Sequence, residues 1–271
     1  MSVHPRRLIL CAVLFVAVPL LGADQFDHEH ATYGAVLRAY VTPPRVDYRA
    51  LKATRASLDR SVGEFDAAAT RAEPAWTREQ RMAFWINAYN AFTLQAIVDH
   101  YPIRSGWLTR YPRNSIRQID GVWTTLKWRA AGRTVTLDDI EHRILRPEFK
   151  DARMHFAVNC ASTSCPPLAA EPYRARTLDA QLDDAARTYM ASDEGLQVTR
   201  DTLRVSSIFK WFGDDFVKEY AGAIGGEQEA KERAILGVID QHGPPAAAAR
   251  ARTGVPAIRY LEYDWSLNDT R

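Results

Sequence analysis

The segment from Thr77 to Val98, TREQRMAFWINAYNAFTLQAIV, decides how this chain folds. It begins with a capping-box pattern, in which Thr77 is the N-cap and Gln80 follows three residues later. Apolar residues then occupy nearly every side of the expected helix, which is typical of a helix buried in the middle of a domain. Tyr101 and Pro102 end it, because the residue before a proline disfavours helical backbone. We therefore predict a long central helix with the rest of the domain packed around it.

Two asparagines interrupt this apolar helix. Asn87 and Asn90 are three residues apart and therefore lie on one face. A buried amide without hydrogen-bond partners costs about 1–3 kcal/mol, so both side chains need partners. Two uses are open. Both side chains tether loop backbone, or they line a pocket in which one of them binds a substrate or orients a ring beside His155.

The segment from Arg153 to Cys160 has the pattern of a β-strand. In a strand, the even-numbered side chains would face the core, and the polar residues His155 and Asn159 would share the opposite face. A chain reversal through residues 161–164 would return Cys165 toward that polar face. The sequence therefore predicts a polar site beside the central helix.

Three interpretations of the cysteines remain open. Cys165 as nucleophile, His155 as base and Asn159 as orienting group would form a catalytic set. In an oxidising compartment, Cys160 and Cys165 would instead pair as a disulfide that closes a tight loop. With His142 and His155, the two cysteines would supply four metal ligands, but their spacing fits no compact zinc motif. We predict no metal site and no cofactor.

A second polar pair, Glu141 and His142, lies on a short helix expected over residues 137–145 and capped by Thr136. The apolar stripe of this helix places Glu141 at the border of the core and His142 further out. Asp138 precedes His142 by four residues and is its expected ion-pair partner.

The remaining segments alternate irregularly between helix and strand patterns, which favours an α+β fold. We expect a single domain with a mostly buried central helix packed on a small, largely antiparallel sheet. Further helices are expected at 28–40, 47–65, 177–190, 214–220 and 227–241, strands at 115–119, 122–128, 134–136, 196–199, 203–205 and 258–263, and a linker at 244–249. The aromatic residues of 209–212 and 260–265 are expected to pack in the core rather than to form a sugar-binding platform.

Residues 1–23 have the order of a secretory signal peptide. Arg6 and Arg7 precede an apolar run over residues 8–21, and small residues follow before Asp24. The run is shorter than the roughly 20 residues that a transmembrane helix needs, and an uncleaved anchor is the alternative. We therefore expect an exported soluble protein, periplasmic or secreted, with no membrane association beyond the signal peptide.

Charge argues against one class of partner. Residues 1–23 hold two of the 35 Lys and Arg and none of the 33 Asp and Glu, so the remainder of the chain is balanced. A nucleic-acid-binding protein needs a basic surface, so we expect no nucleic-acid partner. We divide the remainder into an N-terminal helical segment, 24–75, and a domain over 76–271.

Four separated motifs strongly resemble domain-of-unknown-function family 547: FWINAYNA (84–91), IEHRILR (140–146), HFAVNCASTSCPPL (155–168) and SSIFKWF (206–212). A fifth, YDWSLN (263–268), resembles the ending of bacterial members. The resemblance implies an exported bacterial-type member of this family and a pocket, without specifying a reaction. The family is similar in architecture to papain-like and transglutaminase-like thiol folds. In those folds the nucleophilic cysteine opens the central helix, whereas residues 85–91 here contain no cysteine.

Three functions are consistent with these residues: a binding or scaffold role on an enzyme-like fold, a thiol-dependent hydrolase or acyl transferase acting on an envelope amide or ester, and a metal-dependent enzyme. Because paired cysteines leave no free thiol, the binding role is favoured. Its partner would be a small molecule or an envelope ligand. The residues expected to line the pocket are Asn87, Asn90, Glu141, His142 and Cys160.

Overall fold

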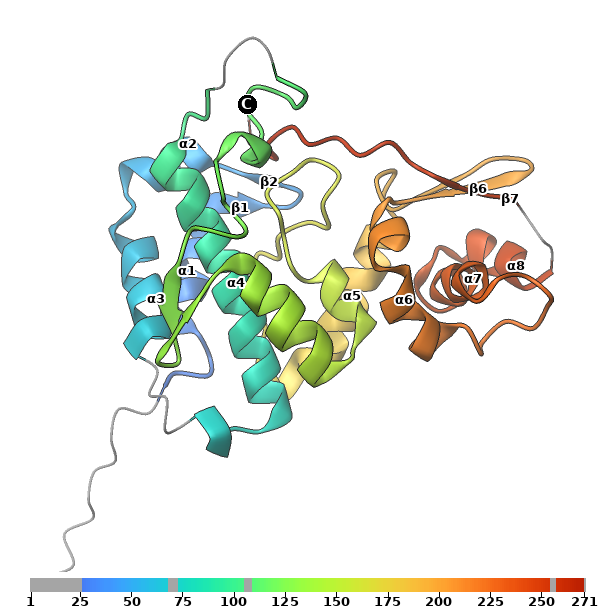
Figure 1. Ribbon diagram of the computed structural model, residues 1–271, viewed down its shortest axis with the longest axis horizontal. Helices are drawn as coiled ribbons and strands as arrows, with labels where there is room; N and C mark the ends of the chain where they lie inside the picture. The colour runs from blue at the N-terminus through green and yellow to red at the C-terminus, as the bar shows by residue number, and fades with distance from the viewer. Residues whose placement is uncertain (1–25, 68–72, 105–108, 254–256, 271) are drawn as a thin grey trace, which may run out of the picture.

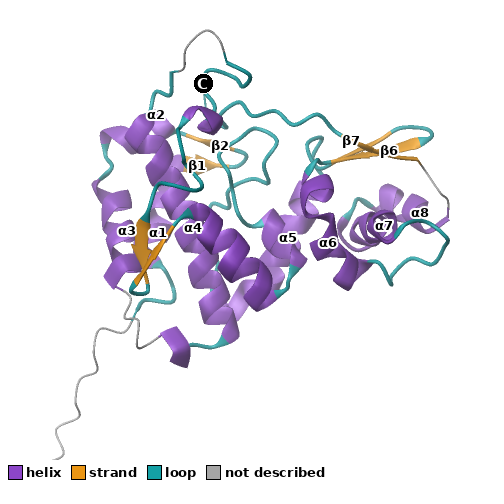
Figure 2. Cartoon of the chain, in the orientation of Figure 1, coloured by secondary structure: helices purple, strands orange, loops and turns teal. Residues whose placement is uncertain are grey.

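The computed structural model of the chain describes residues 26–67, 73–104, 109–253 and 257–270. The expected signal peptide, residues 1–23, lies outside these ranges. Within the described ranges, no helix is both long enough and apolar enough to cross a membrane. Helices dominate, and the strands form small sheets, which confirms the α+β class (Figure 1; Figure 2).

The first half of the chain packs around the central helix α4 (Figure 1). Two helices, α2 and α3, pack on α4, α1 packs on both of them, and a π-helix, η3, also packs on α4. Two short antiparallel hairpins, β1–β2 and β3–β4, complete this half. Its elements are α1 (Ala31–Tyr40), β1 (Val41–Thr42), β2 (Arg45–Val46), α2 (Tyr48–Ala53), α3 (Ala56–Ala67), η1 (Glu73–Ala75), α4 (Arg78–His100), η2 (Ile116–Gln118), β3 (Trp128–Ala130), β4 (Arg133–Val135) and η3 (Asp139–Phe149).

The central helix forms as its sequence predicts. Thr77 Oγ1 accepts a hydrogen bond from the Gln80 amide at 3.2 Å, and the Gln80 side chain accepts one from the Thr77 amide at 2.9 Å. Every residue from 82 to 94 is buried. The helix packs on the β3–β4 hairpin through the rings of Phe92 and Trp128, which stack with centroids 5.3 Å apart. A hydrogen bond also joins the helix to this hairpin: Trp128 Nε1 donates to Gln95 Oε1 at 2.8 Å.

The second half of the chain builds a separate apolar cluster around α6 and α7. A three-stranded sheet lies beside these helices, with β5 antiparallel and β7 parallel to the middle strand β6. The elements are η4 (Ala152–Phe156), η5 (Ala175–Thr177), α5 (Leu178–Met190), β5 (Leu196–Val198), β6 (Thr202–Val205), α6 (Ile208–Tyr220), α7 (Ala230–His242), α8 (Pro245–Thr253) and β7 (Ala257–Tyr260).

The C-terminal segment joins the two halves. After β7, residues 261–270 run back across the molecule to the first half, as the red trace in Figure 1 shows. On the way, Leu267 forms an antiparallel bridge with Ser162, and Asp269 a parallel bridge with Val46. Tyr48, at the start of α2, donates from its hydroxyl to Asn268 Oδ1 at 2.7 Å. This segment therefore holds the loop after residue 159 in place from outside.

The predicted strand over 153–160 is wrong. The chain forms the 3-10 helix η4 there and then an irregular segment. Asp151 caps η4 by accepting from the Arg153 amide at 3.1 Å. Met154 packs in the first apolar cluster and Phe156 in the second, while His155 between them is also buried. Because the segment lies between two cores and is buried on several sides, its apolar residues follow no strand period.

Other predicted elements changed in smaller ways. Within 115–119 the chain forms η2 (Ile116–Gln118) instead of a strand, and within 122–128 only Trp128 is in a strand. The predicted linker over 244–249 is instead the start of α8, which opens at Pro245, a residue suited to the first helical position. The hairpins predicted around 128–136 and 196–205 are confirmed.

Candidate functional site

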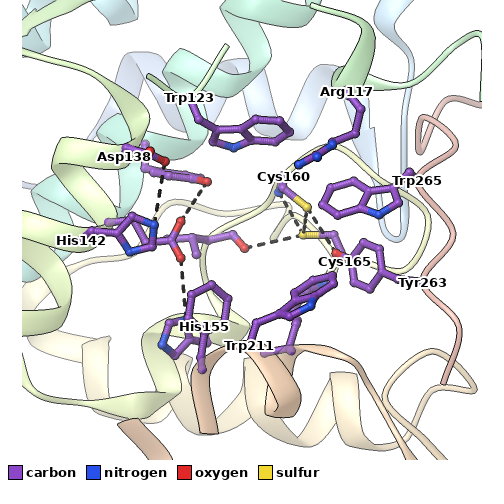
Figure 3. Close-up of a pocket in the computed structure, with 16 residues that line it drawn as sticks. Arg117, Trp123, Asp138, His142, His155, Cys160, Cys165, Trp211, Tyr263 and Trp265 are labelled. Atoms are coloured by element: carbon purple, nitrogen blue, oxygen red, sulfur yellow. Dashed lines mark hydrogen bonds and ion pairs between the residues drawn. The ribbon is translucent and has the colours of Figure 1, made fainter. Parts of the chain in front are cut away.

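A cavity of about 220 Å³ lies where the two apolar clusters meet (Figure 3). Its walls come from five distant parts of the chain: α4, the segment from η2 to residue 123, η3, the segment from η4 to residue 166, and the C-terminal third. Both cysteines, two histidines and two carboxylates line it, together with an arginine and several aromatic rings. Such a concave site with convergent polar groups is a typical place for ligand binding or catalysis.

The loop that carries the cysteines is held by asparagine side chains. Asn90, on α4, donates to the Ala157 carbonyl at 2.9 Å and accepts from the Asn159 amide at 2.8 Å. The side chain of Asn159 donates to the Pro166 carbonyl at 2.8 Å and accepts from the Ala161 amide at 2.9 Å. Ala161 has a left-handed φ of 57°, which is unfavourable for a residue with a Cβ. These bonds make the loop a rigid holder for the two thiols.

The two cysteines are free, so the predicted disulfide is wrong. Their sulfurs lie 2.9 Å apart, well beyond the roughly 2.05 Å of a covalent S–S bond. The Cys160 amide donates to the Cys165 sulfur at 2.9 Å. Both line the cavity, but Cys160 is half-buried whereas Cys165 is 6% exposed.

Their surroundings make the two thiols unequal. Hydrogen bonding with Cys165 lowers the pKa of Cys160 to about 7 against the opposing effect of burial. The hydroxyls of Ser162, at 3.2 Å, and Tyr263, at 3.3 Å, add to this lowering. Burial and the neighbouring Cys160 raise the pKa of Cys165 well above its usual value. Of the two thiols, Cys160 is therefore the one that ionises near neutral pH, while Cys165 stays protonated.

A carboxyl group with a raised pKa faces the same cavity. Glu141 projects from η3 and is buried, and the Tyr89 hydroxyl donates to its Oε2 at 3.3 Å. Burial raises the pKa of Glu141 to about 7, and the charge on Cys160 raises it further in the same direction. A carboxyl that titrates near neutral pH can both give and take a proton.

His155 lies behind this carboxyl. Its Nδ1 is 3.9 Å from Glu141 Oε1, and its Nε2 is 2.8 Å from Asp215 Oδ2. The ring is 2% exposed and stacks on Phe212 with centroids 4.2 Å apart. Burial lowers the pKa of His155, so the ring is neutral near pH 7. If the hydrogen on Nε2 binds Asp215, Nδ1 is left as the acceptor that faces Glu141.

Asp215 holds this histidine from α6. Burial works against its charge, but hydrogen bonds from His155 and Arg146 hold the pKa of Asp215 below its usual range. The Arg146 guanidinium binds both carboxylate oxygens, at 2.6 and 3.1 Å. At the rim, His142 lies 3.8 Å from Asp138, the partner that the sequence predicts. Asp215, His155 and Glu141 thus lie in a row, in this order, and the row ends at the cavity.

Aromatic rings form the other side of the cavity. Figure 3 shows Trp211, Tyr263 and Trp265 on the side away from His142. Trp211 and Trp265 stack with centroids 5.8 Å apart, and Trp211 is 46% exposed. Core packing was the expected use of these residues, and that prediction is wrong for Trp211.

The structure brings together five of the predicted site residues: His155, Cys160, Cys165, Glu141 and His142 all line the cavity. The other three do not line it. Asn87 donates to the Tyr173 carbonyl at 2.8 Å and accepts from the Tyr173 amide at 2.9 Å, so both α4 asparagines tether backbone. Asn159 braces the loop and does not orient His155, because Asp215 takes that position.

Sequence reasoning missed Asp215, Tyr89, Arg117 and most of the aromatic wall. Trp211 and Tyr263 lie inside motifs that carry the family resemblance, which was the available signal. Asp215 is 60 residues from His155 and falls on a helix face with nothing to single it out. Among the described residues, no three His, Cys, Asp or Glu side chains converge as metal ligands, so the four-ligand set that includes both cysteines is not assembled.

Fold and cavity together define an α+β protein with a thiol at the centre of its candidate site. Residues 74–190 match the model of the family described as "Protein of unknown function, DUF547", which is the family that the motifs resemble. Comparisons with curated proteins and with solved structures gave no match. The family match ends before the residues from 211 to 265 that complete the cavity wall.

Proposed function

We propose that this protein is a thiol-dependent acyl-transfer enzyme that cleaves an amide or ester, with Cys160 as its nucleophile. The observation that carries the proposal is the position of Cys160: it is half-buried at the cavity, with Cys165, Ser162 and Tyr263 all within hydrogen-bonding distance of its sulfur. Hydrogen bonds from such neighbours to one sulfur stabilise a thiolate, the reactive form of cysteine. The sequence had assigned this role to Cys165.

The remaining residues suit the proton transfers of such a reaction. The Cys160 thiolate would attack the carbonyl carbon, forming a C–S bond and a tetrahedral oxyanion. Glu141, as the carboxylic acid, would protonate the leaving nitrogen or oxygen as the C–N or C–O bond breaks. The resulting thioester would then be attacked by water or another acceptor, whose proton returns to the Glu141 carboxylate. His155, oriented by Asp215, would hold Glu141 and share its proton.

The test is selective alkylation. The purified protein, kept without reductant, is treated with iodoacetamide and the modified residue is identified by mass spectrometry. We expect modification of Cys160 with half-maximal rate near pH 7, about 1.5 pH units below an ordinary cysteine. Cys160→Ser should abolish it. Finding no reactive thiol, or modification confined to Cys165, would remove the proposal.

A second candidate is a binding role without turnover, which the aromatic side of the cavity favours. Under that role, ligands would bind equally well to wild type and to Cys160→Ser, and no acyl-enzyme would form with activated esters. A covalent adduct of the correct acyl mass on wild type, absent in the variant, decides for the enzyme.

We further propose that the protein works outside the cytoplasm, in the periplasm or as a secreted protein, where an envelope amide or ester would be its substrate. The pattern of residues 1–23 supports this. N-terminal sequencing of the protein from its native cell should find a chain that begins near Asp24. A chain that retains Met1 and stays in the cytosolic fraction would contradict export.

A further inference from the structure

Arg117 stands apart from the other charged residues of the cavity because aromatic rings surround it. Its guanidinium carbon lies 4.4 Å from the Tyr111 ring centroid, 5.0 Å from that of Trp265 and 5.4 Å from that of Trp123. Tyr111 and Trp123 flank Arg117 in the chain, each six residues away, and Trp265 comes from the C-terminal segment. The Ser115 hydroxyl, which accepts from the Arg117 amide at 3.1 Å, fixes the backbone beneath. The side chain is therefore held in one place at the cavity wall.

The charge of Arg117 has no counterpart in the described part of the chain. No described carboxylate forms an ion pair with it, whereas Arg146, on η3, is bound by Asp215. Of the five N–H donors on a guanidinium, one meets the Tyr111 hydroxyl at 2.6 Å. Arg117 thus keeps donors and a full positive charge for a ligand.

Side chains of opposite charge lie on opposite sides of the cavity. In Figure 3, Arg117 and Trp265 lie on one side, Asp138 and His142 on the other, and the two sulfurs between. An anionic ligand group would be repelled by Asp138 and attracted by Arg117, so its position in the cavity would be set before any bond forms. Arginine also binds a carboxylate through two parallel hydrogen bonds, which fixes orientation as well as position.

We propose that Arg117 is the anion subsite of this cavity, and that the substrate is an acyl compound carrying a free carboxylate close to the carbonyl that Cys160 attacks. This inference rests on the proposed function. The carboxylate would pair with Arg117, and the rings of Trp123 and Trp265 would cover the adjoining apolar part of the molecule. The subsite would thereby present the carbonyl to the sulfur.

Two probes that differ only in charge test this. Hippurate carries a ring, an amide and a carboxylate, and hippuramide replaces the carboxylate by a neutral amide. Each is titrated for its ability to protect Cys160 of the full-length protein from iodoacetamide at pH 7. We expect hippurate to protect at a concentration about tenfold or more below that of hippuramide, as a charge-assisted bidentate pair implies.

The variants make the result specific. Arg117→Gln should bring the two protection curves together, while Arg113→Gln, an exposed arginine of the same segment that does not line the cavity, should leave the preference intact. Thermal unfolding of both variants checks that the fold is kept. Equal protection by the two compounds, including no protection by either, or a preference that survives Arg117→Gln, would overturn the subsite.

Failure of the proposed function would be seen separately. If Cys160 proves unreactive, the same titrations are followed by tryptophan fluorescence, since Trp123 and Trp265 lie against Arg117. If wild type then binds hippurate more tightly than hippuramide and Arg117→Gln does not, the subsite is supported and the thiol mechanism is excluded. A reactive Cys160 without any preference would leave the mechanism standing and remove the subsite.

Discussion

The asparagines of α4 and the cysteines of the 159–165 loop are both buried polar groups, but they have different kinds of partners. Asn87 and Asn90 each bind one backbone N–H and one backbone C=O, so they behave like short pieces of extra backbone pairing. Cys160 has side chains as partners and lies at a cavity. Polar side chains that hydrogen-bond to backbone groups stabilise the fold, whereas polar side chains gathered around a cavity are available for chemistry.

The largest effect should come from the α4 asparagines. Asn90→Ala leaves a buried carbonyl at Ala157 and a buried amide at Asn159 unpaired. Since each such group costs about 1–3 kcal/mol, we expect a loss of about 3 kcal/mol in the free energy of unfolding. Urea unfolding measures it, with Asn114→Ala, an exposed asparagine, as control. A loss below about 1 kcal/mol would mean that water replaces these bonds and that the asparagine is not a structural clamp.

Replacement of the second thiol should act on reactivity more than on stability. Cys165→Ala removes the main cause that lowers the pKa of Cys160. Raising that pKa toward an ordinary cysteine value would cut the thiolate fraction at pH 6 by up to about 30-fold, equivalent to about 2 kcal/mol. The pH profile of iodoacetamide alkylation should shift to higher pH. An unchanged midpoint would show that the Cys165 thiol does not support the thiolate.

The carboxylate that holds His155 should give a pH-dependent effect. The folded pKa of Asp215 is depressed, so its stabilisation is full above its unfolded pKa, about 3.9, and is lost as pH falls below that value. For this partly exposed group we expect Asp215→Asn to cost about 1.5 kcal/mol at pH 7 and progressively less below pH 4.

The comparison with α4 sharpens this test, because the amide of Asn90 does not titrate and the cost of Asn90→Ala should stay constant from pH 2 to 7. Unfolding of both variants and wild type across this range measures the difference. A constant cost for Asp215→Asn would show that its charge contributes nothing to the fold.

The smallest effect should follow from Tyr263→Phe. It removes one of the weaker donors to Cys160, at 3.3 Å, and keeps the ring in the aromatic wall. We expect alkylation at pH 6 to slow by a factor of about 2–5, below 1 kcal/mol, with the midpoint moving upward. Alkylation faster than wild type would show that the hydroxyl shields the sulfur rather than stabilising its charge.

Local sequence patterns predicted those features whose causes are local. The capping box at Thr77 and the apolar run after it predict α4, because capping and helical burial depend on residues a few positions apart. The pairing of His142 with Asp138 follows the same four-residue spacing. The segment 153–160 failed for the opposite reason, since its burial comes from two clusters built by distant parts of the chain.

By itself, the sequence determined the central helix, the hairpins, the α+β class and the presence of cysteines and histidines in the family motifs. Only the tertiary structure decided which of these residues meet. It placed Asp215 instead of Asn159 on His155, gave the less buried position to Cys160 instead of Cys165, and set Arg117 against the distant Trp265. The reason is physical: pKa values, burial and ion pairing depend on distances through space between residues far apart in the chain, which no local pattern encodes.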